Sequence, residues 1–331
     1  MTQSLRYAGV LGTGSYVPPQ VVTNDDLAKR IDTSDEWIRS RTGIRERHIA
    51  APDVATSDLA VEAARRALAS ADLTPRDIDL VIVATCTPDH PGSFPSTASI
   101  VQNALGATRA GAFDLGAVCS GFAYSLHVAA QMVASGAVGK ALVIGAETLS
   151  RITNWNDRNT AVLFGDGAGA VVLGQVDQPG YLGGHLWADG SGAPLLNVPA
   201  GGSRTPLTAD CMESSANTIY QNGKEVYKFA VTTMGEAALA VLKELDIDPA
   251  DVDLLVPHQA NIRIITSAAE RIGLPIEKVF INLDKYGNTS AATIPIALDE
   301  AVRTGAIRKG SLVVTVGFGG GLTWAANVIR F

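Results

Sequence analysis

Three short motifs of this chain carry side chains that can do covalent chemistry. Cys119 lies in DLGAVCSGF, His258 in LVPHQAN and Asn288 in YGNTSAA, each directly after an apolar, strand-like run or at the start of a helical pattern. A thiol is a nucleophile, whereas a neutral imidazole and an amide can donate hydrogen bonds to a developing oxyanion. Together the motifs supply one nucleophile and two donors.

The cysteines have a plainer interpretation, because a free cysteine is most often a small buried hydrophobe. We assign that role to Cys86 and Cys211. Cys119 differs because Gly116 and Gly121 flank it and a helix is expected to begin beside it. The unpaired N–H groups and positive dipole end of such a helix would lower the thiol pKa.

The other two residues also have structural alternatives. A single histidine near a strand is commonly a satisfied core residue, and asparagine is favoured as a helix cap. For Asn288 this alternative is as good as the functional one until Cys119 and His258 are considered with it.

Two further motifs predict nothing functional. Gly165, Gly167 and Ala170 fit G-x-G-x-x-A, but Val171–Leu173 continues as a strand where a dinucleotide-binding motif needs a helix. Cys86 and His90 have a metal-like spacing without a second pair, so we expect no metal site.

The elements that must position these residues alternate between short β-branched runs and helical stretches, which predicts an α/β fold with mainly parallel strands. Thr33–Glu36 reads as a capping box, and Ser57 and Ser96 read as helix caps. Strands are expected near residues 79–85, 111–115, 141–146, 170–173, 252–256, 278–282 and 312–317.

An internal repeat is the most informative feature of the organisation. Residues 62–82 align with residues 236–256 without a gap, and a second window aligns 119–140 with 288–309. We therefore predict two duplicated halves, 1–178 with the cysteine and 179–331 with the histidine and asparagine. A loop-rich stretch, 189–222, has no counterpart and is expected to cap a site.

The aligned copies differ where chemistry is expected. In these windows Cys119 lies over Asn288 and Ala84 lies over His258. All of these positions follow predicted strands, and ligands of open parallel sheets bind beyond the carboxyl ends of the strands.

Composition excludes several classes of protein. The 331 residues carry a net charge of −7, which disfavours a broad nucleic-acid-binding surface. The apolar runs are too short to span a membrane. With three cysteines and no signal-peptide pattern, we expect a cytoplasmic protein.

One local basic cluster follows Trp37: Arg39, Arg41, Arg45 and Arg47. Taken alone it reads as a solvated helix face.

Six segments of the chain resemble the β-ketoacyl-acyl carrier protein synthase III family of the thiolase superfamily. They are SDEWIRSRTGIRERHIA (34–50), DLGAVCSGF, FGDGAGA, LVPHQANIRI (255–264), GNTSAA (287–292) and GFGGGLTW (317–324). The resemblance runs over nearly the whole chain. It implies a five-layered αβαβα fold built from two duplicated halves.

The resemblance also implies an acyltransferase mechanism. Cys119 would accept an acyl group, acetyl in the first instance, from acyl-CoA, with the N–H groups of Cys119 and Gly320 as oxyanion hole. His258 and Asn288 would then stabilise the enolate formed by decarboxylation of malonyl-acyl carrier protein. Condensation yields a β-ketoacyl-acyl carrier protein, and no cofactor is implied.

Further roles follow from the same resemblance. Trp37 and Arg158 would sandwich the CoA adenine, with Arg41 and Asn261 also binding CoA. Phe318 would shield the site, and Phe94 would close the primer pocket of a partner in a homodimer. A basic patch would bind the acyl carrier protein: Lys224, Lys228, Arg263 and Arg271.

Two departures from the family pattern leave details open. The Pro/Gly-rich run 88–95 is longer than usual, which leaves the primer open, and Glu270 interrupts the basic patch. The main alternative is a ketosynthase or acyltransferase of secondary metabolism that uses a non-acetyl primer. A non-condensing scaffold is disfavoured because Cys119 and His258 are both present, and a nicotinamide-dependent oxidoreductase because a strand follows Gly165.

Overall fold

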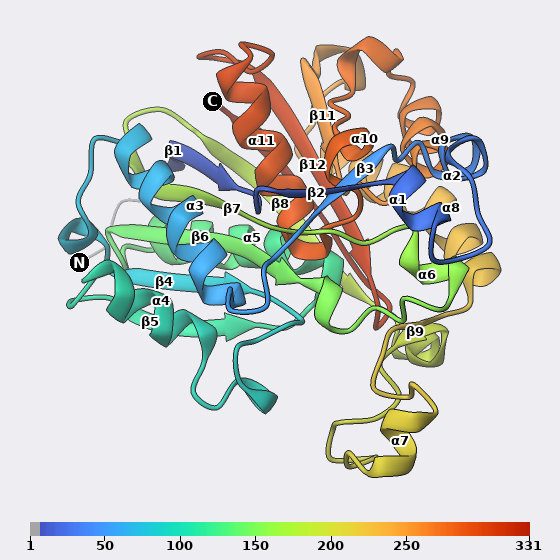
Figure 1. Cartoon of the computed structure of the whole chain (residues 1–331). Helices are drawn as coiled ribbons and strands as arrows, with labels where there is room; N and C mark the ends of the chain where they lie inside the picture. Colours follow the sequence, from blue (N-terminus) through green and yellow to red (C-terminus); the bar gives the residue numbers. More distant parts are fainter. Residues whose placement is uncertain (1–6) are drawn as a thin grey trace.

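A computed structural model describes residues 7–331 of the chain and shows two β-sheets between three layers of helices (Figure 1). The first sheet has the strand order β1-β7-β6-β4-β5, and the second has the order β8-β13-β12-β11. The first sheet comprises β1 (Tyr7–Tyr16), β4 (Leu80–Ala84), β5 (Gly111–Leu115), β6 (Lys140–Thr148) and β7 (Asp166–Val176). The second comprises β8 (Tyr181–Ala188), β11 (Leu254–Pro257), β12 (Leu312–Gly319) and β13 (Thr323–Arg330).

The helices pair off by layer. The outer helices of the first sheet are α3 (Thr56–Ser70) and α4 (Thr97–Leu105), and those of the second are α8 (Gly223–Glu244) and α9 (Ile262–Ile272). Between the sheets lie α5 (Gly121–Ala134) and α11 (Thr293–Arg303), whose apolar residues share one core with both sheets. A helix that is apolar on most faces must be buried on most faces, as α5 is.

Shorter elements surround this frame. They are β2 (Gln20–Thr23), α1 (Asn24–Ala28), α2 (Asp35–Thr42), β3 (Glu46–Ile49), α6 (Arg158–Ala161), β9 (Leu196–Asn197), α7 (Ala209–Glu213), β10 (Tyr220–Gln221) and α10 (Leu283–Tyr286). Two 3-10 turns precede the central helices: η3 (Val118–Ser120) before α5 and η8 (Ser290–Ala292) before α11. No helix of residues 7–331 is long and apolar enough to cross a membrane.

The two sheets share one topology, which confirms the predicted duplication. Strand for strand, β1, β7, β6 and β4 correspond to β8, β13, β12 and β11 in spatial order. The parallel pair β4 and β5 is echoed by a parallel bridge between Leu255 and Val279. We propose that the halves meet in the exposed turn 177–179, close to the predicted boundary at residue 178.

Several sequence predictions need correction. The sheets are mixed: β7 runs antiparallel to both β1 and β6, and β13 is antiparallel to both of its neighbours. Residues 278–282 form no strand, only the bridge at Val279 after a 3-10 turn. The prediction missed β1, whose small and glycine-rich sequence lacks a clear period-two pattern.

The caps are partly as predicted. Ser96 caps α4 by accepting a hydrogen bond from the Ser99 N–H. In α2 the cap is Ser34, not Thr33, and Ser57 lies inside the first turn of α3. The proposed cap segment 189–222 is divided: its two ends reach the cavity described below, while α7 projects away from the body (Figure 1).

Candidate active site

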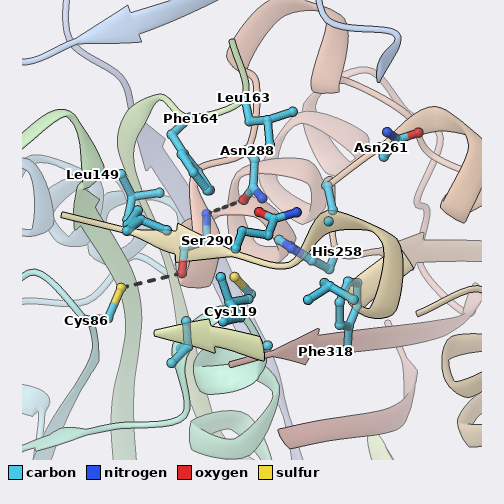
Figure 2. A pocket seen from close by; sticks show the side chains of 18 of the residues that line it. Cys86, Cys119, Leu149, Leu163, Phe164, His258, Asn261, Asn288, Ser290 and Phe318 are labelled. Carbon is cyan, nitrogen blue, oxygen red and sulfur yellow. Dashed lines mark hydrogen bonds between the residues drawn. The ribbon is translucent and has the colours of Figure 1, made fainter. Parts of the chain in front are cut away.

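A cavity of about 300 Å³ lies between the halves and brings Cys119, His258 and Asn288 together (Figure 2). The rest of its wall is largely apolar: Val118, Leu149, Ile152, Leu163, Phe164, Leu196, Val198, Ile219, Val226, Ile264 and Phe318. The cavity is therefore suited to an acyl chain that ends at a reactive thiol.

Cys119 stands at a sharp turn between a strand and a helix. After β5 ends, Val118 takes a left-handed backbone conformation with φ of +47°, which is strained for a β-branched residue. The end of β12 presses against this turn, since a Cβ at Gly319 would lie 2.6 Å from the Cys119 N. Only glycine permits this approach, which sets the β12 backbone beside the thiol.

The expected lowering of the Cys119 pKa is not seen. Burial raises the pKa of the thiol to about 12, opposed by hydrogen bonding from Ser290 and from its own backbone. Cys119 is only 6% exposed, and a thiolate there loses its hydration. The free site therefore holds a neutral thiol.

Asn288 is held so that its amide nitrogen has no hydrogen-bond partner among residues 7–331. Its Oδ1 accepts a hydrogen bond of 2.8 Å from the Ser290 N–H, while its backbone is fixed between Leu163 and Gly165. With the oxygen occupied, the Nδ2 group is the side available to a ligand in the cavity. Asn288 can therefore donate a hydrogen bond there.

His258 directly follows β11, where its N–H bonds to the carbonyl of Val316 in β12. Its Nδ1 lies 2.7 Å from the Thr293 Oγ1, and its ring meets Phe318 edge to face with centroids 5.6 Å apart. Burial lowers the pKa of His258 to about 3, so the ring is neutral. It is thus a poor base for the Cys119 thiol, whose pKa burial raises.

The structure changes the alignment of the two halves at the site. Before α5 the left-handed residue is Val118, and before α11 it is Ser290, with φ of +49°. This places Cys119 over Ala291, three residues from the predicted counterpart Asn288. The C-terminal ends of α5 and α11 still keep the offset of the predicted alignment of 119–140 with 288–309. They do so because α11, with 11 residues, is three residues shorter than α5, with 14. Asn288 lies in the loop before η8 and is not the counterpart of Cys119 in the first half.

The cluster around Trp37 is assembled only in part. Arg41 and Arg158 each lie over the Trp37 ring with the guanidinium carbon 4.8 Å from its centroid. Arg158 also bonds to the carbonyl of Asp32, so a base could enter between Arg158 and Trp37 only if Arg158 swung away.

Two arginines of the basic cluster that follows Trp37 already have partners within the protein. Arg39 pairs with Asp35. Arg47 is fully buried and donates to the Val22 and Val162 carbonyls and to Asn24, and burial lowers its pKa to about 10. Arg47 is therefore not part of the exposed basic cluster that follows Trp37.

The other predicted site residues differ in their distance from the cavity. Asn261 lines the wall and donates to the Arg41 carbonyl, which ties the start of α9 to the Trp37 cluster. Phe318 also lines the cavity. Gly320 is buried directly after β12, where a Cβ would lie 2.8 Å from the Leu196 carbonyl. Phe94 lies outside this cavity and is 89% exposed.

The predicted carrier-protein patch spans α8 and α9. Lys224 and Lys228 are exposed on α8. On α9, Arg263 donates to the Ser40 carbonyl, and Arg271 is paired with Glu236 at 2.5 Å.

Sequence reasoning missed three buried residues of the site, Glu147, Ser290 and Thr293, and the position of the half-buried Cys86 in the cavity wall. Glu147 is fully buried and accepts hydrogen bonds from Cys86 and from both Thr85 and Thr87. Cys86 lines the cavity, with its Sγ 3.9 Å from the Ser290 Oγ. Burial raises the Cys86 pKa well above its usual value, and the neighbouring Glu147 acts in the same direction. Only the proximity of Ser290 and Thr293 to Asn288 in sequence could have signalled their role.

Comparison with known proteins identifies the family. Residues 113–197 match the family model described as 3-oxoacyl-[acyl-carrier-protein (ACP)] synthase III, and residues 242–331 match the model of its C-terminal part. The β-ketoacyl-[acyl-carrier-protein] synthase III of Caldanaerobacter subterraneus subsp. tengcongensis is 58% identical over 325 residues, 98% of either chain. That of Clostridioides difficile is 53% identical over 324 residues, again 98% of either chain.

Solved structures agree with the sequence matches. The 3-oxoacyl-[acyl-carrier-protein] synthase III of Aquifex aeolicus superposes with a TM-score of 0.90 at 46% identity, covering 98% of this chain and 100% of that one. The priming β-ketosynthase of the R1128 polyketide pathway gives a TM-score of 0.92 at 37% identity, covering 100% and 98%. With its thiolase-like duplicated fold and relatives matched over almost its entire length, the chain belongs to the β-ketoacyl-[acyl-carrier-protein] synthase III family.

Proposed function

We propose that this chain catalyses the condensation that initiates type II fatty-acid synthesis, with Cys119 as its nucleophile. Members of its family are acyltransferases of the condensing class, and the identity to synthase III relatives over nearly the whole chain favours this over secondary metabolism. The observation that carries the proposal is one cavity lined by a thiol from the first half and by two hydrogen-bond donors from the second (Figure 2).

In the first half-reaction the Cys119 Sγ attacks the thioester carbonyl of an acyl-CoA, and we propose acetyl-CoA as the primer. A C–S bond to Cys119 forms as the bond to CoA breaks, and the thiol proton ends on the departing CoA sulfur. The N–H groups of Cys119 and Gly320 hold the oxyanion of the tetrahedral intermediate. The contact of β12 with η3 at Gly319 supports this pairing of two backbone donors.

In the second half-reaction the thioester oxygen of malonyl-acyl carrier protein accepts hydrogen bonds from His258 and Asn288. Loss of carbon dioxide leaves an enolate, whose negative charge these donors stabilise. Its carbon attacks the acyl-cysteine, and Cys119 leaves and regains a proton from water. The free Nδ2 of Asn288 and the neutral ring of His258 support the donor roles.

The substrates imply partners and surroundings that we include in the proposal. Trp37, Arg41, Arg158 and Asn261 bind CoA at the mouth of the cavity, and Lys224, Lys228, Arg263 and Arg271 meet the acidic carrier protein. No step changes an oxidation state, so the reaction balances without a redox cofactor. The free state of all three cysteines suits the cytoplasm.

We also propose that the enzyme works as a homodimer. Phe94 is a large aromatic side chain left 89% exposed, and the proposed dimer would cover it. In the dimer it would close the primer pocket of the other subunit and so limit the length of the acyl chain.

The decisive experiment incubates the protein with acetyl-CoA and with longer or branched acyl-CoAs, and then locates the added mass by peptide mapping. We expect acylation at Cys119 and none in Cys119→Ala. Acylation at another residue would refute the mechanism, and so would the absence of acylation with every primer.

The roles of the donors are tested by His258→Ala and Asn288→Ala. Each variant should still acylate Cys119 but lose malonyl decarboxylation by about a hundredfold, because each removes one oxyanion donor. An equal collapse of acylation would show that the donors serve the first half-reaction instead.

A further inference from the structure

The neutral ring of His258 can take two tautomers, and only one of them fits the role proposed above. In the Nε2–H form the ring donates into the cavity, whereas in the Nδ1–H form Nε2 presents a lone pair there. An enolate oxygen would be stabilised by the first form and repelled by the second. Something in the protein must therefore select the tautomer.

Thr293 is the residue in a position to do so. Its Oγ1 lies 2.7 Å from the His258 Nδ1, and both side chains are only 1% exposed. Among residues 7–331 this is the one hydrogen bond found for the His258 ring. Thr293 is the first residue of α11, so its position is fixed by the helix between the two sheets.

The hydroxyl of Thr293 has one proton and two acceptors in reach. One is the Ser290 carbonyl at 2.9 Å, and the other is the His258 Nδ1. The Ser290 carbonyl already accepts the backbone N–H of Thr293 itself, whereas the Nδ1 has no other donor. If the proton goes to Nδ1, the Ser290 carbonyl still keeps the Thr293 N–H as its donor; if it goes to the Ser290 carbonyl, Nδ1 must carry its own proton and donate to the Thr293 Oγ1.

We propose that Thr293 is a positioning residue whose hydroxyl donates to the His258 Nδ1 and thereby holds the ring in the Nε2–H tautomer. This inference rests on the proposed function, because the tautomer matters only if His258 is an oxyanion donor. A hydroxyl suits this role better than a carboxylate, which would stabilise the charged imidazolium and favour base chemistry. The burial that lowers the pKa of His258 to about 3 acts in the same direction, keeping the ring neutral.

The test compares Thr293→Val, which removes the hydroxyl at nearly constant shape, with Thr293→Ser, which keeps it. Nitrogen-15 NMR of the imidazole reports the tautomer directly. We expect an Nε2–H signature in the unmodified protein and in Thr293→Ser, and a detectable Nδ1–H population in Thr293→Val. In Thr293→Val malonyl decarboxylation should fall about tenfold while acylation of Cys119 stays within about twofold, and Thr293→Ser should recover most of the loss.

A matched control is available four residues earlier, at the start of η8. The Thr289 hydroxyl is also buried but has no hydrogen-bond partner among residues 7–331, so Thr289→Val should change neither the spectrum nor the decarboxylation rate. If Thr293→Val fails to fold by thermal melting, Thr293→Ala supplies the variant without the hydroxyl, and an Nδ1–H ring in the unmodified protein still overturns the proposal.

Two results would overturn the proposal: an Nδ1–H ring in the unmodified protein, or equal losses of acylation and decarboxylation in a folded Thr293→Val. Failure of the unmodified protein to acylate Cys119 would instead refute the proposed function. The NMR readout would then still report whether Thr293 selects the tautomer.

Discussion

At the scale of single residues, burial favours the neutral forms of both the Cys119 thiol and the His258 imidazole. The same burial that raises the pKa of Cys119 to about 12 lowers that of His258 to about 3. Desolvation disfavours the charged form of either group, which moves an acid up and a base down. Burial therefore disfavours a resting thiolate–imidazolium pair, and in the proposed mechanism the oxyanion donors supply the stabilisation during the reaction.

This neutrality has a measurable pH dependence. Because the thiolate is the species that iodoacetamide attacks, the alkylation rate of Cys119 should rise roughly tenfold per pH unit from pH 7 to 9 without a plateau. A pKa lowered by the helix would instead give a plateau near neutral pH. The measurement is the rate of label incorporation at the Cys119 peptide, with Cys119→Ser to subtract labelling of Cys86 and Cys211.

At the scale of elements, the contact between β12 and η3 decides the shape of the site. Gly319 ends β12 against the Cys119 N, and Gly145 in β6 packs even more closely against η8, where an added Cβ would clash with the Ala291 carbonyl. Each half thus presses a glycine of a central strand against the turn that starts a central helix. Such contacts leave no room for a side chain without backbone movement.

Gly319→Ala tests the first of these contacts. The added methyl group meets backbone rather than a flexible side chain, so we expect a loss of about 1–3 kcal/mol of stability and at least tenfold slower acylation of Cys119. Denaturant unfolding and single-turnover acylation provide the two readouts.

Gly190→Ala is the control for this substitution, because a Cβ there would meet no atom within 4 Å. Its stability and acylation rate should match those of the unmodified protein. Normal acylation in Gly319→Ala would mean that η3 tolerates displacement and does not depend on β12.

At the scale of the whole molecule, the two halves are interdependent. The central core joins Phe122 and Leu126 of α5 to Ile294 and Leu298 of α11, and both sheets contribute to it. Separation of the halves would expose this apolar surface on each of them. It would also divide Cys119 from His258 and Asn288.

We therefore expect that residues 1–178 and 179–331, expressed separately, neither fold cooperatively nor acylate. Circular dichroism melting and mass spectrometry after incubation with acyl-CoA would show this. Acylation of Cys119 in the isolated first half would contradict the interdependence.

A nicked chain separates the effect of the covalent link from that of the contacts. A protease site inserted in the exposed turn 177–179 and cut after folding should leave an active complex, since the shared core holds the halves together. Dissociation on cutting would show that the link itself is required.

The sequence alone determined the fold class, the duplication and the family, because these depend on local periodicity and on motifs that survive as contiguous letters. Cys119, His258 and Asn288 could be chosen for the same reason. The strand at 278–282 and the exposed role of Arg47 were wrong, since strand pairing and burial depend on neighbours that are distant in the chain.

Only the tertiary structure decided how the site works. The counterpart of Cys119 is Ala291 because α11 is three residues shorter than α5. The gap-free sequence alignment could not show this difference, since the C-terminal ends of both helices keep its offset. The neutral states of Cys119 and His258 come from burial between the two halves, and Thr293 reaches His258 across 35 residues of sequence. Desolvation and hydrogen-bond partnership are properties of the packed interior, which no local pattern of residues encodes.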